Sequence, residues 1–230
     1  MEITCIASSS KGNCYLVKSG NFTFLLDAGV KIDKINQYVN LNEVDFAFIS
    51  HNHKDHSRSV ENLRNSSVLI VSNKETQELN KSSVKSKFGG NPLILIEIPV
   101  THGEEPNNAL VVWNQDEDEM LLYATDFNKC EIKLDSYPFT DVIIECNYLE
   151  DRLIQVEDFK TRRQINTHMG FEGCINFLSD LNLNFCKNIY LCHLSESLCD
   201  EFYVGVSTYG RFKIPTHVCK TFGGVERYGK

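Results

Sequence analysis

Three histidines and an aspartate crowd into six residues, His-Asn-His-Lys-Asp-His at 51–56, and no other segment limits the chain's fold as strongly. In extended backbone after a strand, His51 and His53 point the same way because side chains alternate with a period of two. Asp55 and His56 then follow in a turn. Burying these groups together is costly without a cation. The segment therefore predicts ligands for two metal ions, one held by His51 and His53 and the next by Asp55 and His56.

Two ions need further ligands, and the chain offers polar residues at the ends of predicted strands. His102 follows a strand-like apolar run, Asp126 ends Leu-Leu-Tyr-Ala-Thr-Asp, and His193 ends Asn-Ile-Tyr-Leu-Cys-His. Strand ends lead into loops, where binding residues gather. Asp126 is expected to bridge both ions, and imidazole with carboxylate suits zinc, manganese or iron. A single histidine at a strand end is more often structural, and that interpretation is kept for His217.

The apolar pattern predicts an α/β chain in which short strands dominate and helices are inserted at intervals. The predicted strands are 3–7, 14–18, 22–27, 45–50, 67–72, 93–98, 108–114, 119–125, 141–146, 188–193 and 212–219. The predicted helices are 31–40, 54–64 and one that begins just after His168, and residues 73–92 are helix-like before a turn. This order fits two facing mixed β-sheets with helices outside, in a single domain over residues 1–230.

The composition indicates the compartment of the protein and the kinds of partner that it can bind. Nine cysteines are scattered without a Cys-x-x-Cys pair, which is typical of buried thiols in a reducing compartment. The start has no secretory pattern and no apolar run could span a bilayer, so a cytoplasmic protein without membrane contact is expected. The formal net charge of −8 argues against a long nucleic-acid footprint but is compatible with a nuclease that grips a chain end. Lys160, Arg162 and Arg163 form a small basic cluster, which is more often simply solvated.

The run Phe-Ile-Ser-His-Asn-His-Lys-Asp-His resembles the HxHxDH signature of metallo-β-lactamase-fold hydrolases, and the resemblance covers about residues 3–200. It implies an αββα sandwich in which His102, Asp126 and His193 are the later ligands. Asp27, in Leu-Leu-Asp-Ala-Gly, matches the superfamily's earlier aspartate and is expected to orient the histidine segment through hydrogen bonds. The signature does not specify a reaction, because members cleave lactams, thioesters and phosphodiesters.

Shorter segments are similar to one branch of that superfamily. The opening Ser-Ser-Ser-Lys-Gly-Asn-Cys-Tyr-Leu-Val is similar to the start of YycJ-like proteins and implies a loop with Ser10 and Asn13 lining the site. Glu145 and His168 occur in the same order as a proton-transferring Glu–His pair of YycJ-like proteins and ribonuclease Z. Thr167 replaces the glycine of that pattern, and the exosite arm of ribonuclease Z and the inserted domain of β-CASP nucleases are missing.

This resemblance implies a dinuclear metal-dependent phosphodiester hydrolase that uses two Zn²⁺ or Mn²⁺ ions and a metal-bridging hydroxide. Asp55, His168 and Glu145 are the expected catalytic residues, with His168 protonating the leaving alkoxide. The leading interpretation is an exonuclease-like nuclease acting on DNA or RNA ends. The alternative, favoured by the acidic pI, is a phosphodiesterase for cyclic nucleotides or small oligonucleotides. A thioester or lactam hydrolase and a non-catalytic metal-binding protein follow, and a homodimer is expected from the resemblance only.

Overall fold

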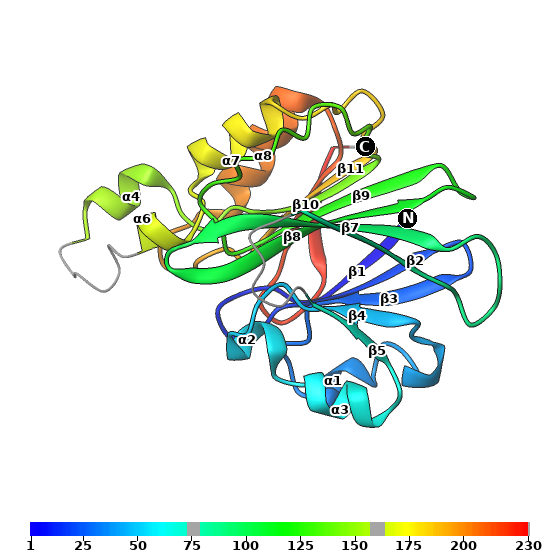
Figure 1. Ribbon diagram of the computed structural model, residues 1–230. Helices are drawn as coiled ribbons and strands as arrows, with labels where there is room; N and C mark the ends of the chain where they lie inside the picture. Colours follow the sequence, from blue (N-terminus) through cyan, green and yellow to red (C-terminus); the bar gives the residue numbers. More distant parts are fainter. Residues whose placement is uncertain (73–78, 157–163, 230) are drawn as a thin grey trace.

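The computed structural model describes residues 1–72, 79–156 and 164–229, so the predicted basic cluster Lys160, Arg162 and Arg163 lies outside the described residues. Two β-sheets face each other, with helices on both outer sides (Figure 1). The smaller sheet has the order β1-β2-β3-β4-β5, formed by β1 (Glu2–Ala7), β2 (Cys14–Ser19), β3 (Phe22–Leu26), β4 (Phe46–Phe48) and β5 (Leu69–Val71). The larger sheet has the order β13-β12-β11-β10-β9-β8-β7-β6, formed by β6 (Asn80–Val84), β7 (Leu93–His102), β8 (Glu105–Asn114), β9 (Glu119–Ala124), β10 (Asp141–Glu145), β11 (Asn188–Cys192), β12 (Thr216–Cys219) and β13 (Val225–Tyr228).

The two longest helices, α7 and α8, lie on the side of the larger sheet (Figure 1). They are α1 (Ile32–Ile35), the 3₁₀ helix η1 (Leu41–Glu43), α2 (Lys54–Ser57), α3 (Val60–Asn65), α4 (Glu150–Ile154), α6 (Gln164–Thr167), α7 (Phe171–Ser179) and α8 (Glu201–Phe212). None of the described helices is long and apolar enough to cross a membrane.

Three apolar layers hold the sandwich together, and the alternation of side chains along each strand assigns residues to them. On β9, Leu121 and Tyr123 face the layer between the sheets. Leu122 and Ala124 face the layer under α7 and α8. A third layer lies between the smaller sheet and its helices, where Ile35 and Leu63 are fully buried. Central strands are therefore apolar on both faces, which explains their unbroken hydrophobic runs. The predicted layering of two mixed sheets with helices outside is confirmed.

Several predicted elements differ from the observed ones. Residues 80–84, in the stretch predicted as helix-like, form the edge strand β6, which among the described strands pairs with β7 alone and so tolerates a polar sequence. The predicted helix at 54–64 is divided into α2 and α3, and the one at 31–40 is the single turn α1. Residue 212 ends α8, a helix that was not predicted, and the strand expected at 212–219 begins at Thr216 and is followed by β13.

In each sheet, neighbouring parallel strands end at the same height, so the residues that follow them lie close together. In the smaller sheet Leu26 at the end of β3 lies opposite Phe48 at the end of β4. In the larger sheet Glu145 at the end of β10 lies opposite Cys192 at the end of β11. Because parallel neighbours end at the same edge, the residues that follow these strands converge at one end of the sandwich.

Candidate metal centre

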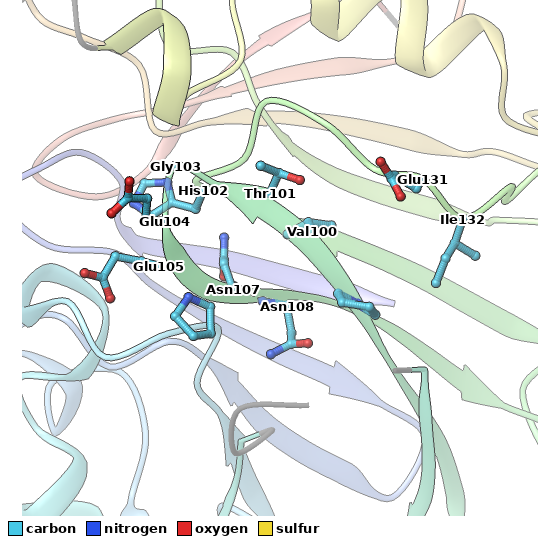
Figure 2. Close-up of a pocket in the computed structure, with 12 residues that line it drawn as sticks. Val100, Thr101, His102, Gly103, Glu104, Glu105, Asn107, Asn108, Glu131 and Ile132 are labelled. Atoms are coloured by element: carbon cyan, nitrogen blue, oxygen red, sulfur yellow. Dashed lines mark hydrogen bonds between the residues drawn. The ribbon is translucent and has the colours of Figure 1, made fainter. Parts of the chain in front are cut away.

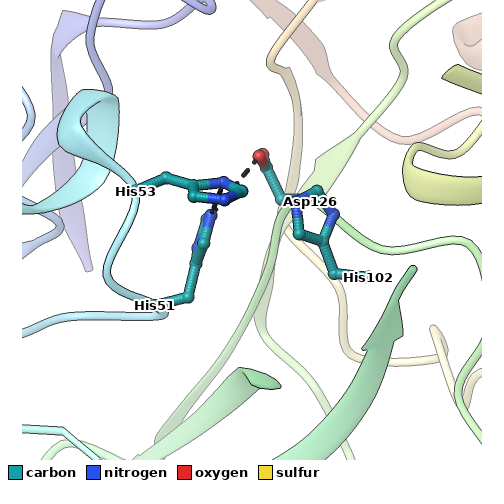
Figure 3. Close-up of side chains that lie close together, drawn as sticks. All are labelled: His51, His53, His102 and Asp126. Carbon is teal, nitrogen blue, oxygen red and sulfur yellow. Dashed lines mark hydrogen bonds and ion pairs between the residues drawn. The ribbon is translucent and has the colours of Figure 1, made fainter. Parts of the chain in front are cut away.

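His51, His53, His102 and Asp126 form one ligand group, called here the outer group (Figure 3). Each offers one ligand atom, and these atoms lie within 4.8 Å of one another. His51 Nε2 faces His53 Nδ1 at 2.9 Å and lies 3.8 Å from Asp126 Oδ2. His102 donates Nδ1–H to the carbonyl oxygen of Thr167 at 2.7 Å, which directs its Nε2 away from that contact.

Asp55, His56, Asp126 and His193 form a second ligand group, the inner group. His56 Nε2 lies 3.4 Å from Asp55 Oδ2 and 3.3 Å from Asp126 Oδ2. His193 Nε2 lies 3.4 Å from Asp126 Oδ1, and it is buried without a hydrogen-bond partner among the described residues. Asp126 belongs to both groups, as expected of a carboxylate that bridges two ions.

A buried network behind the inner group fixes the orientation of His56. Asp27 Oδ2 accepts a hydrogen bond from His56 Nδ1 at 2.6 Å and another from the Tyr123 hydroxyl at 2.5 Å. Ser50 donates its backbone N–H and its hydroxyl to the same carboxylate. With Nδ1 engaged, Nε2 is the ring nitrogen of His56 that faces the other ligands. Asp27 therefore acts on the site through His56, which is the arrangement by which outer partners orient metal-binding histidines.

The backbone at the site adopts conformations that most residues avoid. Asp27, Asp126 and His193 have positive φ angles of 56°, 51° and 54°. Non-glycine residues rarely adopt this region, and strain of this kind gathers at functional sites. Gly29 has a different constraint, because a Cβ there would lie 1.6 Å from the carbonyl oxygen of Asp55. The strands β3, β9 and β11 are thus each followed by a sharp turn, at Asp27, Asp126 and His193 respectively.

The loop at residues 8–13 packs against the ligand segment. Asn13 is fully buried, its amide bonds the backbone N–H and carbonyl of Ser9, and its Nδ2 lies 3.1 Å from His56 Nε2. Its own backbone N–H donates to the Asp55 carbonyl at 2.7 Å. Ser10 is exposed at the tip of the loop. The structure thus places Asn13 against the inner group and Ser10 at the surface.

Glu145 joins two histidines at the inner edge of the cluster. Its Oε1 lies 2.7 Å from His168 Nδ1 and 3.1 Å from His193 Nδ1. Its other oxygen, Oε2, accepts the backbone N–H groups of Phe127 and Met169. The carboxylate is fully buried, whereas the His168 side chain keeps 16% of its surface exposed. Glu145 therefore holds the candidate ligand His193 and also His168, whose side chain is partly exposed.

Charges divide the histidines into two kinds. Burial lowers the pKa of His51 to about 2, and the neighbouring His56 adds to that effect, so the His51 ring is neutral. Burial would also lower the pKa of His56 and His193, but nearby carboxylates, Asp126 foremost, outweigh it. They raise the pKa of His56 well above its usual value and that of His193 to about 10. The inner group thus lies in a negative potential that favours cations.

The donor set suits divalent metal ions. Two imidazole nitrogens face each other at 2.9 Å, a buried His193 nitrogen has no partner among the described residues, and a buried carboxylate lies between both groups. A cation gives the lone pairs of these groups a shared partner, because imidazole and carboxylate are the ligands of zinc and manganese sites. The chemistry of the residues therefore fits metal binding.

Several residues that complete the site were not predicted from the sequence. Tyr123 and Ser50 hold Asp27, and Asn147 donates from its amide to the His193 carbonyl oxygen at 2.8 Å. Ser8 accepts the backbone N–H of His193 at 2.8 Å. The period-two pattern of β9 could have indicated that Tyr123 points between the sheets. The other three depend on contacts between distant segments.

Comparison with known proteins agrees with this architecture. Residues 10–72 match the family described as the Metallo-beta-lactamase superfamily, and no curated protein sequence matches the chain. The metallo-beta-lactamase fold protein YhfI from Bacillus subtilis is 15% identical, with 98% of each chain covered and a TM-score of 0.70. The short form of human tRNase Z is 11% identical, covering 96% of this chain and 97% of the other, with a TM-score of 0.66. Unliganded yeast PDE1 is 10% identical, covering 97% and 98%, with a TM-score of 0.64.

Proposed function

Because this chain has the metallo-β-lactamase fold, with its histidine and aspartate cluster at one end of the sandwich, we propose that it is a dinuclear metal-dependent phosphodiester hydrolase. The observation that carries the proposal is the Glu145–His168 pair beside the cluster, joined at 2.7 Å. Cleaving a phosphodiester releases an alkoxide, which is a poor leaving group and needs a proton donor. Lactam and thioester hydrolysis do not require this pair.

The outer and inner groups are the proposed ligands of the two ions, with Asp126 shared between them. Two divalent cations held there supply Lewis acidity toward phosphate oxygens and lower the pKa of water, so that a nucleophile exists at neutral pH. Zn²⁺ and Mn²⁺ are the ions that these ligands favour.

His168 is the proposed general acid. Burial by itself lowers its pKa, but the charge and hydrogen bond of Glu145 outweigh burial and raise the pKa above the usual histidine value. The hydrogen bond occupies Nδ1, so a second proton resides on Nε2, the nitrogen that remains for a substrate oxygen. The ring of His168 lies 5.1 Å from that of His193 and 5.4 Å from that of His102. A phosphate bound between the two ligand groups therefore lies next to this proton.

Nucleic acid is the proposed substrate, and the chain end is the proposed point of attack. Similarity in fold to human tRNase Z supports a nucleic-acid substrate. The net charge of −8 weighs against a long bound polyanion. An exonuclease-like enzyme that holds only the terminal nucleotides satisfies both observations.

One cavity favours a second candidate, a phosphodiesterase for cyclic nucleotides or small oligonucleotides. The cavity, of about 400 Å³, adjoins the cluster through His102 at the β7–β8 turn (Figure 2). Glu104, Glu105 and Glu131 are among its lining residues. Glu131 is paired with Lys129 at 2.8 Å, and the carboxylates of Glu104 and Glu105 disfavour further phosphates of a polymer on that side. A small substrate with one phosphodiester meets no such restriction, and yeast PDE1 is among the similar structures.

The test is hydrolysis by the Zn²⁺- or Mn²⁺-loaded protein of single- and double-stranded DNA, RNA, cyclic nucleotides and bis-p-nitrophenyl phosphate. We expect cleavage of polymers from their ends, abolished in Asp55→Ala. In His168→Ala the rate on alkoxide-releasing substrates should fall by about 10²–10⁴-fold, because general acid catalysis contributes that much. Bis-p-nitrophenyl phosphate releases a stable phenolate, so its hydrolysis should fall far less. His217→Asn serves as the histidine control away from the cluster.

Each of these assays distinguishes between the two proposed functions. Cleavage of cyclic nucleotides alone would transfer the assignment to the second candidate. If His168→Ala lowered the rate equally on alkoxide-releasing substrates and on bis-p-nitrophenyl phosphate, His168 would not be the general acid. If the metal-loaded protein hydrolysed no phosphodiester at all, the proposed function would be wrong, and thioesters would be assayed next.

A further inference from the structure

Phe222 is an exposed aromatic side chain on an anchored turn. It lies between β12 and β13 and is 79% exposed, the highest value among the large hydrophobic side chains of the described residues. The turn is fixed by a hydrogen bond from the Gly224 N–H to the Cys5 carbonyl at 2.8 Å. Gly223 has a φ of 100°, and a Cβ there would lie 2.6 Å from the Ile6 carbonyl oxygen. The fold thus anchors the backbone of this turn and leaves the ring of Phe222 exposed to solvent.

Two lysines accompany the ring. Lys11 Nζ lies 5.8 Å from the centroid of Phe222, and Lys34 Nζ donates to the Phe222 carbonyl oxygen at 3.1 Å. Lys11 also pairs with Glu196 at 2.7 Å, and both side chains are more than half exposed. An exposed pair of this kind is weak, so a phosphate can compete for Lys11. Ring and cations together make a small surface, called here the Phe222 rim.

The Phe222 rim adjoins the inner group. Lys11 belongs to the loop whose Asn13 lies 3.1 Å from His56 Nε2. Its partner Glu196 comes three residues after His193 in the sequence. This side of the site differs from the other, where the cavity beside His102 is lined by glutamates. A polyanion that leaves the metal centre on the side of the Phe222 rim meets cations and an aromatic ring.

We propose that the Phe222 rim binds the nucleotide next to the scissile phosphate, with the base stacked on Phe222 and its phosphate on Lys11 and Lys34. The inference rests on the proposed phosphodiesterase function and specifies its substrate class as single-stranded nucleic acid. Stacking on an aromatic side chain accepts every base, because each base has a π-face. The backbone of the turn is already anchored and needs little ordering on binding, which favours recognition of this kind.

Phe88 provides a matched control for the experiment. It is also a solvent-exposed phenylalanine, at 63%. It follows Ser86, whose hydroxyl donates to the Asn21 carbonyl at the turn before β3. That turn lies at the start of β3, whereas the cluster lies beyond its end. Phe88 therefore shares the chemistry of Phe222 but lies at the opposite end of the sandwich.

The first measurement compares cleavage of oligothymidylate, an abasic oligomer of the same length and bis-p-nitrophenyl phosphate. In Phe222→Ala we expect kcat/KM for oligothymidylate to fall about tenfold, the size of one lost base stack. The other two substrates, which have no base to stack, should change little, and Phe88→Ala should match the parent. Phe222→Trp should retain the parent's preference for oligothymidylate over the abasic oligomer. If kcat/KM of Phe222→Ala matched the parent on all three substrates, or fell equally on all three, the proposed role of the Phe222 rim would be wrong.

The second measurement does not depend on turnover. Binding of oligothymidylate should quench the added indole emission of Phe222→Trp, and the parent, whose single tryptophan is Trp113, gives the background. Quenching without cleavage of any phosphodiester would support the rim while contradicting the proposed function. Cleavage of oligothymidylate without quenching would contradict the rim alone. Oligouridylate in the same assays distinguishes RNA from DNA.

Discussion

The inner and outer ligand groups are built from the same residue types, yet the protein holds them differently. His56 and His193 in the inner group are almost fully buried, and each has its Nδ1 against a buried carboxylate, Asp27 or Glu145. In the outer group His53 is exposed, and its Nδ1 faces another imidazole. One half of the centre is therefore fixed by its surroundings, while the other half contains a ligand that can move.

This difference shows that one fold can hold the two halves of a site with different rigidity. His193, which belongs to the inner group and not to the outer one, follows a strand end with a positive φ, and the bonded network compensates for the strain. We expect the inner position to bind its ion more tightly, because its ligands lose little freedom on binding. The outer position should exchange its ion more readily. The predictions below test that order.

Asp126→Ala should have the largest effect, because this residue belongs to both groups. Loss of a shared ligand should release both ions and reduce hydrolysis by far more than the 10–100-fold typical of residues that only orient ligands. Metal content after dialysis, measured by mass spectrometry, checks this. A variant that retained one tightly bound ion would contradict the bridging role.

His56→Ala and His53→Ala should separate the two groups. The first should lose the tight ion, whereas the second should lose only the exchangeable one and keep close to one ion per chain after dialysis. The physical reason is the carboxylate behind His56, which has no counterpart among the hydrogen bonds described for His53. Equal metal content in the two variants would remove the distinction between inner and outer groups.

Asp27→Asn should weaken the inner group without removing a ligand. The amide is similar in shape but carries no charge, so the hydrogen bond to His56 Nδ1 loses its electrostatic support. Metal affinity at the inner position should fall about 10–100-fold, as for other partners of metal-binding histidines. Tyr123→Phe, which removes a donor from the same carboxylate, should have a smaller effect. Titration with a chelator of known affinity measures both variants, and an unchanged inner affinity in Asp27→Asn would mean that the network does not support the ligands.

Much of this arrangement could be predicted from the sequence, because part of it is local. The ligand segment at 51–56 is contiguous, and the distant ligands follow predicted strands, so alternation and strand ends were enough to propose them. The alternation along β9 indicates the direction of Tyr123 but not its partner Asp27, and no local pattern records the contact of Asn147 with His193. Among the elements, β6 was missed because an edge strand paired on one side needs little apolar sequence. The helix α8 was missed because its glycines and β-branched residues are poor helix formers, so its position depends on packing against β12 and β13.

The smallest expected effect concerns His217, a buried histidine that lies outside the cluster. It has none of the carboxylates that raise the pKa of the inner-group histidines, so it shows what burial does without them. Its ring stacks on Tyr190 at 4.4 Å, and its Nε2 lies 3.1 Å from Asn188 Oδ1. Burial, and after it the charge of Arg227, lowers its pKa from 6.5 to about 4. A folded pKa below the unfolded one means that its contribution to stability is complete above pH 6.5 and is lost as the pH falls toward 4.

The variant His217→Phe keeps a stacked ring that does not titrate. Between pH 6.5 and 4 its free energy of unfolding should fall less steeply than that of the parent, by no more than the effect of one proton. Urea titrations at each pH, with a chelator present in both samples, isolate this difference because the six histidines of the site are common to both. Parallel pH profiles would show that His217 has the same pKa in the folded and unfolded chain. In that case burial would not suffice to keep a histidine neutral, and the low pKa of His51, for which burial is the largest cause, would need another explanation.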